Sequence, residues 1–253
     1  MYNFFVNNEQ IINSEATITG ADYNHIVKVL RFNCGQKIYI SNKDNAKSYL
    51  AEIIAIDKNK VICKLISENE STENKVKVTI FQGIPKSDKM DFIVQKCTEL
   101  GALSFYLVEM KNCVMKLNNE DKKIARWQNI AEASSKQSKR NVIPKVNGKI
   151  TIDDVIVKLE EYDLSLVAYE SEKKQSLKSV LLQNKNVKSI AIIIGPEGGI
   201  DQDEYNKLCS AGAKSVTLGK RILRTETAPI AMLSMINYEF ELWFFLKLIF
   251  LTL

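Results

Sequence analysis

Two glycine-containing stretches near the end of the chain carry residue types that can bind a ligand. Residues 195–199 read GPEGG directly after the apolar run SIAIII, and residues 218–228 read LGKRILRTETA directly after KSVT. Ligands of open α/β sheets bind beyond the carboxyl ends of the strands, so two such loops predict one shared site. Gly198 and Gly199 have no Cβ, which lets a ligand approach the backbone. The alternative for the first stretch is a strand-to-helix turn with incidental glycines.

The charges around these glycines limit the ligand. Glu197 lies among them, which is unfavourable beside a pyrophosphate and compatible with a ligand that carries positive charge. The sequence has neither GxGxxG after the first strand of a dinucleotide-binding fold nor GxxxxGK[ST]. A nucleotide-dependent oxidoreductase is therefore a weak alternative, because its phosphate-binding glycines are missing.

The elements that position these loops change in type along the chain. Residues 1–70 are expected to be β-rich and to form a small barrel, with alternating runs at 37–40, 49–56 and 61–66 separated by turn residues. The polar residues 68–75 predict a linker. The rest is expected to be α/β, because strand patterns alternate with helical ones. The expected strands lie at 75–84, 103–110, 165–170, 189–194 and 214–219, and the expected helices at 85–102 and 119–139.

Cap residues predict where three helices begin and where one ends. The candidates are Ser87 or Asp88 at the start and Gly101 at the end of the helix at 85–102, Asp201 with Glu204 as a capping box, and Thr225 or Thr227 before the helix that contains Pro229.

Composition places few limits on function. The chain has 253 residues, of which 45% are hydrophobic and 26% charged, and its formal net charge of +5 weakly indicates a polyanionic partner.

Five cysteines without a CxxC pair favour free thiols in a reducing compartment, with no zinc site. The start lacks the pattern of a signal peptide. The apolar residues 241–253 are too short to span a bilayer and are expected to pack into a core or a subunit interface, with weak membrane association as the alternative.

GPEGGID and LGKRILRTETA together resemble the signature of the SPOUT superfamily of RNA methyltransferases, and specifically the ribosomal RNA small subunit methyltransferase E family. The similarity extends to HIVKVLR at 25–31, KSDKMDFIVQKCTELGA at 86–102 and EASSKQSKRNVIPKV at 132–146, and it covers about residues 1–240. The apolar tail, residues 242–253, departs from the family, whose chains end soon after a stretch like INYEFE.

The resemblance implies a fold class, a cofactor and partners. The fold is α/β, with an N-terminal PUA-like RNA-binding β-barrel at 1–70 and a C-terminal SPOUT α/β methyltransferase domain at 71–253 that ends in a trefoil knot. The implied cofactor is S-adenosyl-L-methionine. The implied protein is a cytoplasmic homodimer without stable membrane insertion, and its partner is 16S rRNA in the small ribosomal subunit. The implied reaction methylates N3 of the uridine conventionally numbered 1498.

The resemblance also implies site residues. The cofactor-binding candidates are Leu166, Ala168, Tyr169, Glu170, Ile194, Gly195, Pro196, Glu197, Gly198, Gly199, Leu218, Gly219, Ile222, Leu223, Arg224, Thr225, Thr227 and Ala228. Methyl transfer needs in-line positioning of the reacting atoms and loss of the N3 proton. Arg224 is the candidate for stabilising charge near the uracil carbonyls, and Glu226 is the candidate base. Each of the two could instead belong to an ion pair within the loop.

Basic residues supply candidate RNA contacts. Residues 136–145 read KQSKRNVIPK, with four cations and no acid, and phosphate contacts there would make binding salt-dependent. The candidates are His25, Arg31, Lys86, Lys89, Lys136, Arg140 and Arg221. A solvated helix face is the alternative for the basic run. The alternative for the whole chain is a non-catalytic RNA-binding or ribosome-assembly protein, against which the two intact loops argue.

Overall fold

The computed structural model describes residues 1–251, and for Ser87 and residues 241–251 it describes the backbone alone. The chain divides into two compact units. The first contains Met1–Glu73 and Ala133–Ile143, and the second contains Asn74–Glu132 and the chain from Pro144 onward. Among the residues with described side chains, no helix has the length and apolarity needed to cross a membrane.

The first unit is built on a six-stranded sheet with the order β1-β4-β5-β6-β3-β2. β1 pairs with β4 in parallel and the other neighbours are antiparallel. The strands are β1 (Asn3–Val6), β2 (Ile11–Ile12), β3 (Glu15–Thr19), β4 (Lys37–Asn42), β5 (Ser48–Ile56) and β6 (Lys60–Glu68). The short helices are η1 (Asn8–Gln10), α1 (Gly20–Asn24) and the π-helix η2 (His25–Leu30). Alternate strand residues such as Ile38, Ile40 and Ile53 fill its core, which confirms the β-rich prediction.

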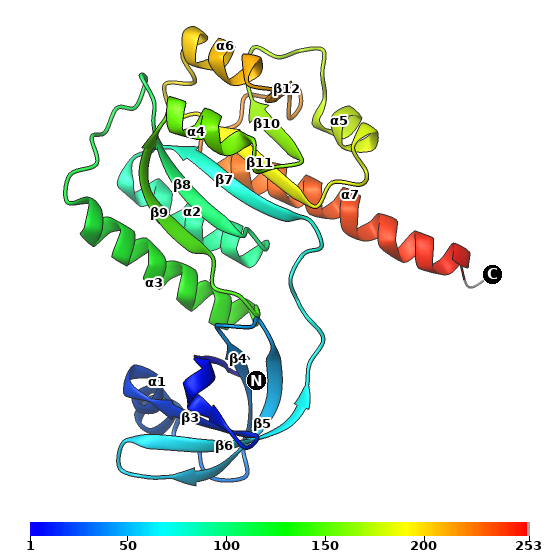
Figure 1. Cartoon of the computed structure of the whole chain (residues 1–253). Coiled ribbons are helices and arrows are strands. Elements are labelled where there is room, and N and C mark those ends of the chain that lie inside the picture. The colour runs from blue at the N-terminus through cyan, green and yellow to red at the C-terminus, as the bar shows by residue number, and fades with distance from the viewer. Residues whose placement is uncertain (252–253) are drawn as a thin grey trace. The chain divides into compact units, whose positions relative to one another are not determined.

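The second unit contains a parallel six-stranded sheet with the order β12-β10-β11-β7-β8-β9 (Figure 1). Its strands are β7 (Lys77–Gly83), β8 (Ser104–Glu109), β9 (Lys145–Thr151), β10 (Leu164–Ala168), β11 (Ser189–Ile194) and β12 (Lys214–Val216). The helices are α2 (Ser87–Glu99), α3 (Glu120–Ser138), α4 (Ile152–Leu159), α5 (Leu177–Gln183), α6 (Gln202–Ser210) and α7 (Thr227–Leu251), and the part of α3 from Ala133 onward belongs to the first unit. The apolar run SIAIII forms β11 in the interior of the sheet, as a strand covered on both faces should.

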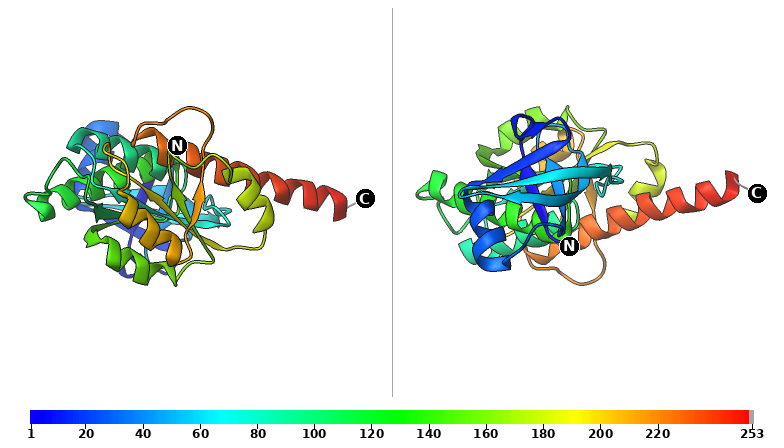
Figure 2. Two further views of the ribbon diagram at one scale, coloured as in Figure 1. Left: turned by 90° about the horizontal axis from the view of Figure 1, so that it is seen from above. Right: turned by 90° about the horizontal axis from the view of Figure 1, so that it is seen from below.

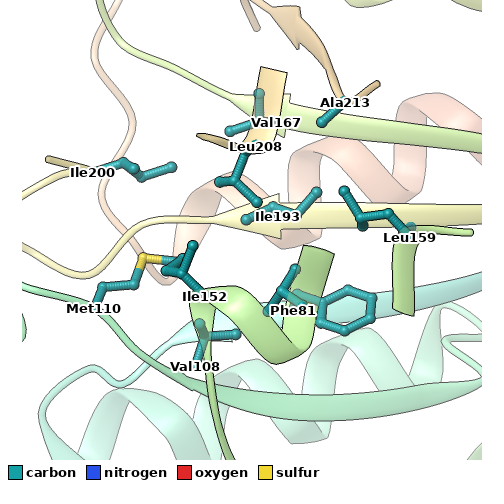
Figure 3. Packing of buried hydrophobic residues seen from close by; sticks show 12 residues of the cluster. Phe81, Val108, Met110, Ile152, Leu159, Val167, Ile193, Ile200, Leu208 and Ala213 are labelled. Carbon is teal, nitrogen blue, oxygen red and sulfur yellow. The ribbon is translucent and has the colours of Figure 1, made fainter. Parts of the chain in front are cut away.

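Helices cover both faces of this parallel sheet (Figures 1 and 2). On one face, Phe81, Val167 and Ile193 of neighbouring strands pack against residues of α4 and α6, including Leu159 and Leu208 (Figure 3). α2 and α7 contact each other on the opposite face, and α7 also contacts β11. The backbone of α7 continues past residue 240 beyond the strands (Figure 2). The expected packing of the apolar tail, residues 242–253, falls outside the described side chains.

The carboxyl ends of the central strands are level with one another. Ala168 of β10 is in register with Ile194 of β11 and with Val216 of β12, and Ile194 is in register with Gln82 of β7. The loops that follow these residues therefore leave the sheet at the same edge, as the sequence predicts for a ligand site.

The first helix of this unit departs from its expected cap. α2 begins at Ser87, so Lys86 occupies the cap position without a side-chain hydrogen bond, and the prediction of Ser87 or Asp88 is wrong. The predicted C-terminal end is confirmed. Gly101 has a φ of 90° and its N–H donates to the Thr98 carbonyl at 3.0 Å, which is the left-handed ending that favours glycine.

Candidate functional site

A cavity of about 370 Å³ lies beyond the carboxyl ends of β10, β11 and β12. Three loops form most of its wall: the loop after β10, the GPEGG loop after β11 and the loop between β12 and α7. The lining residues are Lys89 and positions 168–170, 194–197, 199–200, 216–225 and 228. Segments far apart in the sequence are thus brought to one site.

Most of the predicted cofactor-binding residues line this cavity. Those that do are Ala168, Tyr169, Glu170, Ile194, Gly195, Pro196, Glu197, Gly199, Leu218, Gly219, Ile222, Leu223, Arg224, Thr225 and Ala228. Leu166, Gly198 and Thr227 do not belong to the lining. Leu166 is fully buried within β10. The cavity also includes Lys220 of the predicted loop 218–228, and Ile200, Val216 and Thr217, which lie beside the two loops and carry no signal of their own in the sequence.

The GPEGG loop makes a tight turn. The Gly199 N–H donates to the Pro196 carbonyl at 3.0 Å, and Gly199 has a φ of 72°, a conformation that glycine adopts at low cost. A Cβ on Gly195 would lie 2.8 Å from Cγ1 of Ile200. These glycines are therefore required by the backbone path and the close packing, which excludes incidental glycines at Gly195 and Gly199.

The loop after β8 contacts this turn and the start of α6. The Asn112 amide donates to the Gly198 carbonyl at 3.2 Å, and a Cβ on Gly198 would lie 2.8 Å from the Asn112 carbonyl oxygen. Lys111 Nζ pairs with Asp201 at 2.9 Å, and the Lys111 N–H donates to Glu204 at 2.8 Å. Asp201 caps α6 as predicted. Glu204 binds Lys111 instead of closing the predicted capping box.

Thr225 ties the loop before α7 to the ends of two central strands. Its hydroxyl donates to the Gly195 carbonyl at 2.7 Å and accepts a hydrogen bond from Gln82 Nε2 at 2.9 Å. Both side chains are buried, at 7% exposure for Thr225 and 0% for Gln82. The hydroxyl of Thr225 therefore holds Gly195 rather than capping α7, and the predicted cap at this residue is wrong. The prediction that Pro229 lies in the first turn of α7 is confirmed.

Lys89 of α2 lies between two carboxylates at the wall of the cavity. Its Nζ is 3.1 Å from Glu197 and 3.1 Å from Glu226. Oε2 of Glu226 is buried and meets Lys89 outside hydrogen-bond geometry, so this contact is electrostatic. Two carboxylates share one ammonium, which leaves one net negative charge on the group.

The pKa values in this group are shifted in the directions that ion pairing predicts. Burial raises the pKa of the Glu197 carboxyl, but the hydrogen bond from the Lys86 N–H and the pairing with Lys89 outweigh it, so this pKa lies below its ordinary value. Burial lowers the pKa of Lys89, but Glu197 and Glu226 outweigh it, so this pKa lies above its ordinary value. Both shifts favour the charged forms of Glu197 and Lys89 at neutral pH.

The loop between β12 and α7 also presents cations. Lys220, Arg221 and Arg224 all line the cavity and are exposed. No carboxylate in the described part of the chain pairs with Arg221 or Arg224. Ile222 between them is 78% exposed. This side of the site can bind an anionic ligand.

Two aromatic rings support the loop after β10. Tyr169 stacks on Tyr205 of α6 with ring centroids 4.0 Å apart, and its hydroxyl donates to Gln202 at 3.1 Å. Stacking and the hydrogen bond fix the ring of Tyr169, one wall of the cavity.

The candidate RNA contacts of the first unit differ in their surroundings. His25 is half-buried, with its ring edge-on to Tyr2 and Phe4. Arg31 is exposed and left-handed, with a φ of 53°. Lys136 Nζ pairs with Asp22 at 2.8 Å. In the second unit, Lys86 and Arg221 are exposed, whereas Lys89 is ion-paired.

Arg140 stands apart from the other candidates. It is 3% exposed and pairs with Glu73, which also accepts hydrogen bonds from the N–H groups of Asn141 at 3.0 Å and Val142 at 3.2 Å. Burial and pairing favour a structural role for this arginine within the first unit.

Burial disfavours the thiolate form of three of the five cysteines. Burial raises the pKa of Cys63 to about 12 and also raises the pKa values of Cys97 and Cys113. Within the described residues, no group of three or more His, Cys, Asp or Glu side chains is arranged to hold a metal ion.

Comparison with known proteins identifies the family. Residues 72–237 match a family model described as an RNA methyltransferase domain, and residues 18–66 match one described as an RNA methyltransferase PUA domain. Ribosomal RNA small subunit methyltransferase E of Bacillus subtilis is 37% identical over 233 residues, which cover 89% of this chain and 91% of the relative. The protein of the same name from Mesomycoplasma hyopneumoniae is 33% identical, over 92% of this chain and 98% of the relative.

A solved structure agrees with these relatives. The crystal structure of a Ribosomal RNA small subunit methyltransferase E from Neisseria gonorrhoeae bound to S-adenosyl methionine has a TM-score of 0.82 at 28% identity, over 94% of this chain and 97% of that one. The resemblance seen in the sequence is thereby confirmed: the chain belongs to the ribosomal RNA small subunit methyltransferase E family.

Proposed function

We propose that this protein transfers a methyl group from S-adenosylmethionine to N3 of a uridine in 16S rRNA of the small ribosomal subunit, the nucleotide conventionally numbered 1498. The observation that carries the proposal is the cavity that brings together the three strand-end loops, in a chain of this family. The PUA domain at 18–66 supports an RNA substrate.

The residues of the cavity fit the cofactor. A volume of about 370 Å³ is within the range of small-molecule sites. Gly199 and Gly219 have φ values of 72° and 127°, which glycine adopts readily, and because glycine has no Cβ their backbone can be approached closely. The net negative charge of the group around Lys89 suits a cationic ligand. S-adenosylmethionine supplies a sulfonium-bound methyl group, which is the group to be transferred.

The cavity-lining residues named above are proposed to hold the cofactor. Apolar side chains such as Ile194, Leu218 and Leu223 supply contact area and exclude water, while backbone groups of the glycine loops supply polar contacts. Of the predicted residues outside the lining, Leu166 and Gly198 are proposed to support the loops from behind, whereas Thr227 is exposed at the start of α7.

Arg224 is proposed to stabilise the uridine anion that forms when N3 loses its proton. Its guanidinium is exposed at the cavity, so its N–H groups can donate hydrogen bonds to the uracil carbonyls. Glu226 is the other catalytic candidate. Its contact with Lys89 of α2 favours a structural ion pair over a role as base, although the pair joins the loop to α2 and does not lie within the loop.

The finer points of the fold are proposals as well. We propose a PUA-like RNA-binding domain at 1–70, a SPOUT methyltransferase domain at 71–253 and a C-terminal trefoil knot. The path of the chain after edge strand β12 supports the knot. Before α7 begins, the chain returns to β7, where the Thr225 hydroxyl accepts a hydrogen bond from Gln82. Mechanical unfolding from the two termini tests it: a knotted chain extends less than its residue number allows, and full extension would refute the knot.

We also propose that the protein is a homodimer. A cytoplasmic location without stable membrane insertion is proposed as well, and the ribosomal substrate supports it. Light scattering at several protein concentrations tests the homodimer. The mass of two chains is expected, and a single-chain mass throughout the range would contradict it.

Transfer of a labelled methyl group tests the reaction and the substrate. Small ribosomal subunits and naked 16S rRNA, both from cells lacking this modification, are incubated with the protein and methyl-labelled S-adenosylmethionine. We expect label in the subunits and much less label with Arg224→Ala. No label in either substrate despite intact cofactor binding would refute rRNA as the substrate. Loss of both binding and transfer would favour the non-catalytic RNA-binding alternative.

A further inference from the structure

We infer that Lys89 is a positioning residue that holds the GPEGG loop and the Arg224-bearing loop in one arrangement, and that it does not contact RNA phosphates. This inference deepens the proposed function and rests on it. The contacts are direct, because one ammonium lies 3.1 Å from Glu197 in the first loop and 3.1 Å from Glu226 in the second. The Lys89 side chain is only 22% exposed.

The charge balance around Lys89 argues against phosphate binding. A phosphate that approached Lys89 would also approach Glu197 and Glu226, whose side chains are 20% and 17% exposed. The combined group is net negative and would repel the phosphate. The basic residues Lys220 and Arg221, which are exposed on the neighbouring loop, are the better phosphate contacts.

The position of Glu226 explains how Lys89 acts on the reaction. Arg224, Thr225 and Glu226 are consecutive, and the last two are each fixed: Thr225 to Gly195 at 2.7 Å, and Glu226 to Lys89. These two contacts hold the backbone next to Arg224 on the side of α7, while the Arg224 side chain remains exposed at the cavity and can contact the substrate. Lys89 also holds Glu197, so losing it loosens both walls of the cavity at once.

Three variants separate this role from a general effect of charge. Lys89→Met removes the ammonium and keeps the length of the side chain, and Lys89→Arg keeps the charge. Lys96→Met is the matched control, because Lys96 lies on the same helix and pairs with Glu99 at 2.9 Å, in a pair outside the cavity lining. Thermal unfolding of each variant reports whether the fold is retained.

The first readout needs neither cofactor nor RNA. Hydrogen exchange of the cofactor-free protein should become faster at residues 195–200 and 224–228 in Lys89→Met, and stay unchanged in Lys96→Met and Lys89→Arg. Unchanged exchange at both loops in Lys89→Met would overturn the inference. This measurement stands even if the proposed substrate is wrong.

The second readout is RNA binding as a function of salt. A phosphate contact by Lys89 would contribute about 0.7–0.9 to the slope of log K against log salt concentration. We expect the slope of Lys89→Met to equal that of the wild type. A slope reduced by this amount would overturn the inference and restore Lys89 as an RNA contact.

The third readout is methyl transfer, with the wild type measured beside each variant. Misplacement by about 1 Å can lower a rate about 100-fold, so we expect Lys89→Met to lower kcat by 10- to 100-fold with the RNA KM unchanged. Lys89→Arg should recover most of the loss. If the wild-type protein transfers no methyl group, the proposed function is refuted, whereas the hydrogen-exchange test of Lys89 still applies.

A double-mutant cycle tests the route through Glu226. If Lys89 acts through that carboxylate, Lys89→Met combined with Glu226→Gln should lower kcat no more than the larger of the two single effects. If the fold-decreases in kcat of the two single variants multiply in the double variant, the two residues act independently, and this route is refuted.

Discussion

Replacing Thr225 by valine removes one hydroxyl from the site and keeps the shape of the side chain. The hydroxyl makes two buried hydrogen bonds, donating to the Gly195 carbonyl at 2.7 Å and accepting from Gln82 at 2.9 Å. In the variant, Gln82 keeps its bond to the Gly83 carbonyl at 3.0 Å, whereas Gly195 keeps only a long contact with Gln82 at 3.4 Å. The Gly195 carbonyl is therefore the group left under-satisfied.

The magnitude follows from these bonds. Two neutral hydrogen bonds contribute about 1 kcal/mol each, and a buried carbonyl left short of a partner costs about as much again. We therefore expect Thr225→Val to lower the free energy of unfolding by about 2–3 kcal/mol. Urea titration should show a lower midpoint with an unchanged slope.

The matched control is Thr227→Val, two residues further along. Thr227 is exposed and its hydroxyl has no hydrogen-bond partner among the described residues. Its substitution should change the free energy of unfolding by less than about 0.5 kcal/mol. Equal losses in the two variants, or a loss below about 0.5 kcal/mol for Thr225→Val, would refute the claim that this hydroxyl holds the loop.

Three further predictions concern other parts of the molecule. Gly83→Ala should destabilise the protein by several kcal/mol in urea titration, because its Cβ would lie 2.6 Å from Cδ of Pro196; wild-type stability would contradict the close packing. Arg140→Met should lower the free energy of unfolding by about 3–5 kcal/mol, since it leaves the Glu73 carboxylate without its main partner, and a neutral result would contradict the structural role. The Glu197 pKa is lowered on folding, so its charge stabilises the native state at neutral pH and stops doing so as acid protonates it. The stability difference between wild type and Glu197→Gln should therefore shrink from about pH 7 to about pH 3, and a difference that grows would have the wrong sign.

The sequence predicted the site best where the signal was local. The run SIAIII and the glycines after it form one strand and one turn, and a cofactor site at strand ends follows from a general rule of α/β sheets. The residues that hold the loops were harder to find. Lys111 and Asn112 come from a loop without a recognisable motif, and their contacts with the GPEGG turn depend on the order of strands in the sheet.

Charge patterns alone could not separate structural cations from binding cations. Arg140 lies in a basic run that is typical of an RNA-binding surface, yet Glu73 pairs with it in the fold. Lys89 has the same ambiguity, because both of its carboxylate partners are distant in sequence. Neither pairing has a local signature, since the contacts form only when the chain folds.

Short elements were missed for different reasons. β9 is an edge strand with the sequence KVNGKIT, which lacks an apolar run. α4 has eight residues, too few for a clear helical period. Its start does carry a usable signal, since Thr151 and Asp154 form a capping box. The assignment of residues 133–143 to the first unit had no local signal at all.

The position of the transferred methyl group tests the central claim most directly. Small ribosomal subunits modified by this protein with methyl-labelled S-adenosylmethionine would be digested to nucleosides and to mapped fragments, and both would be analysed by mass spectrometry. The account predicts label in 3-methyluridine, confined to the fragment that contains the uridine conventionally numbered 1498. Label in another nucleoside, or in another part of the rRNA, would contradict it.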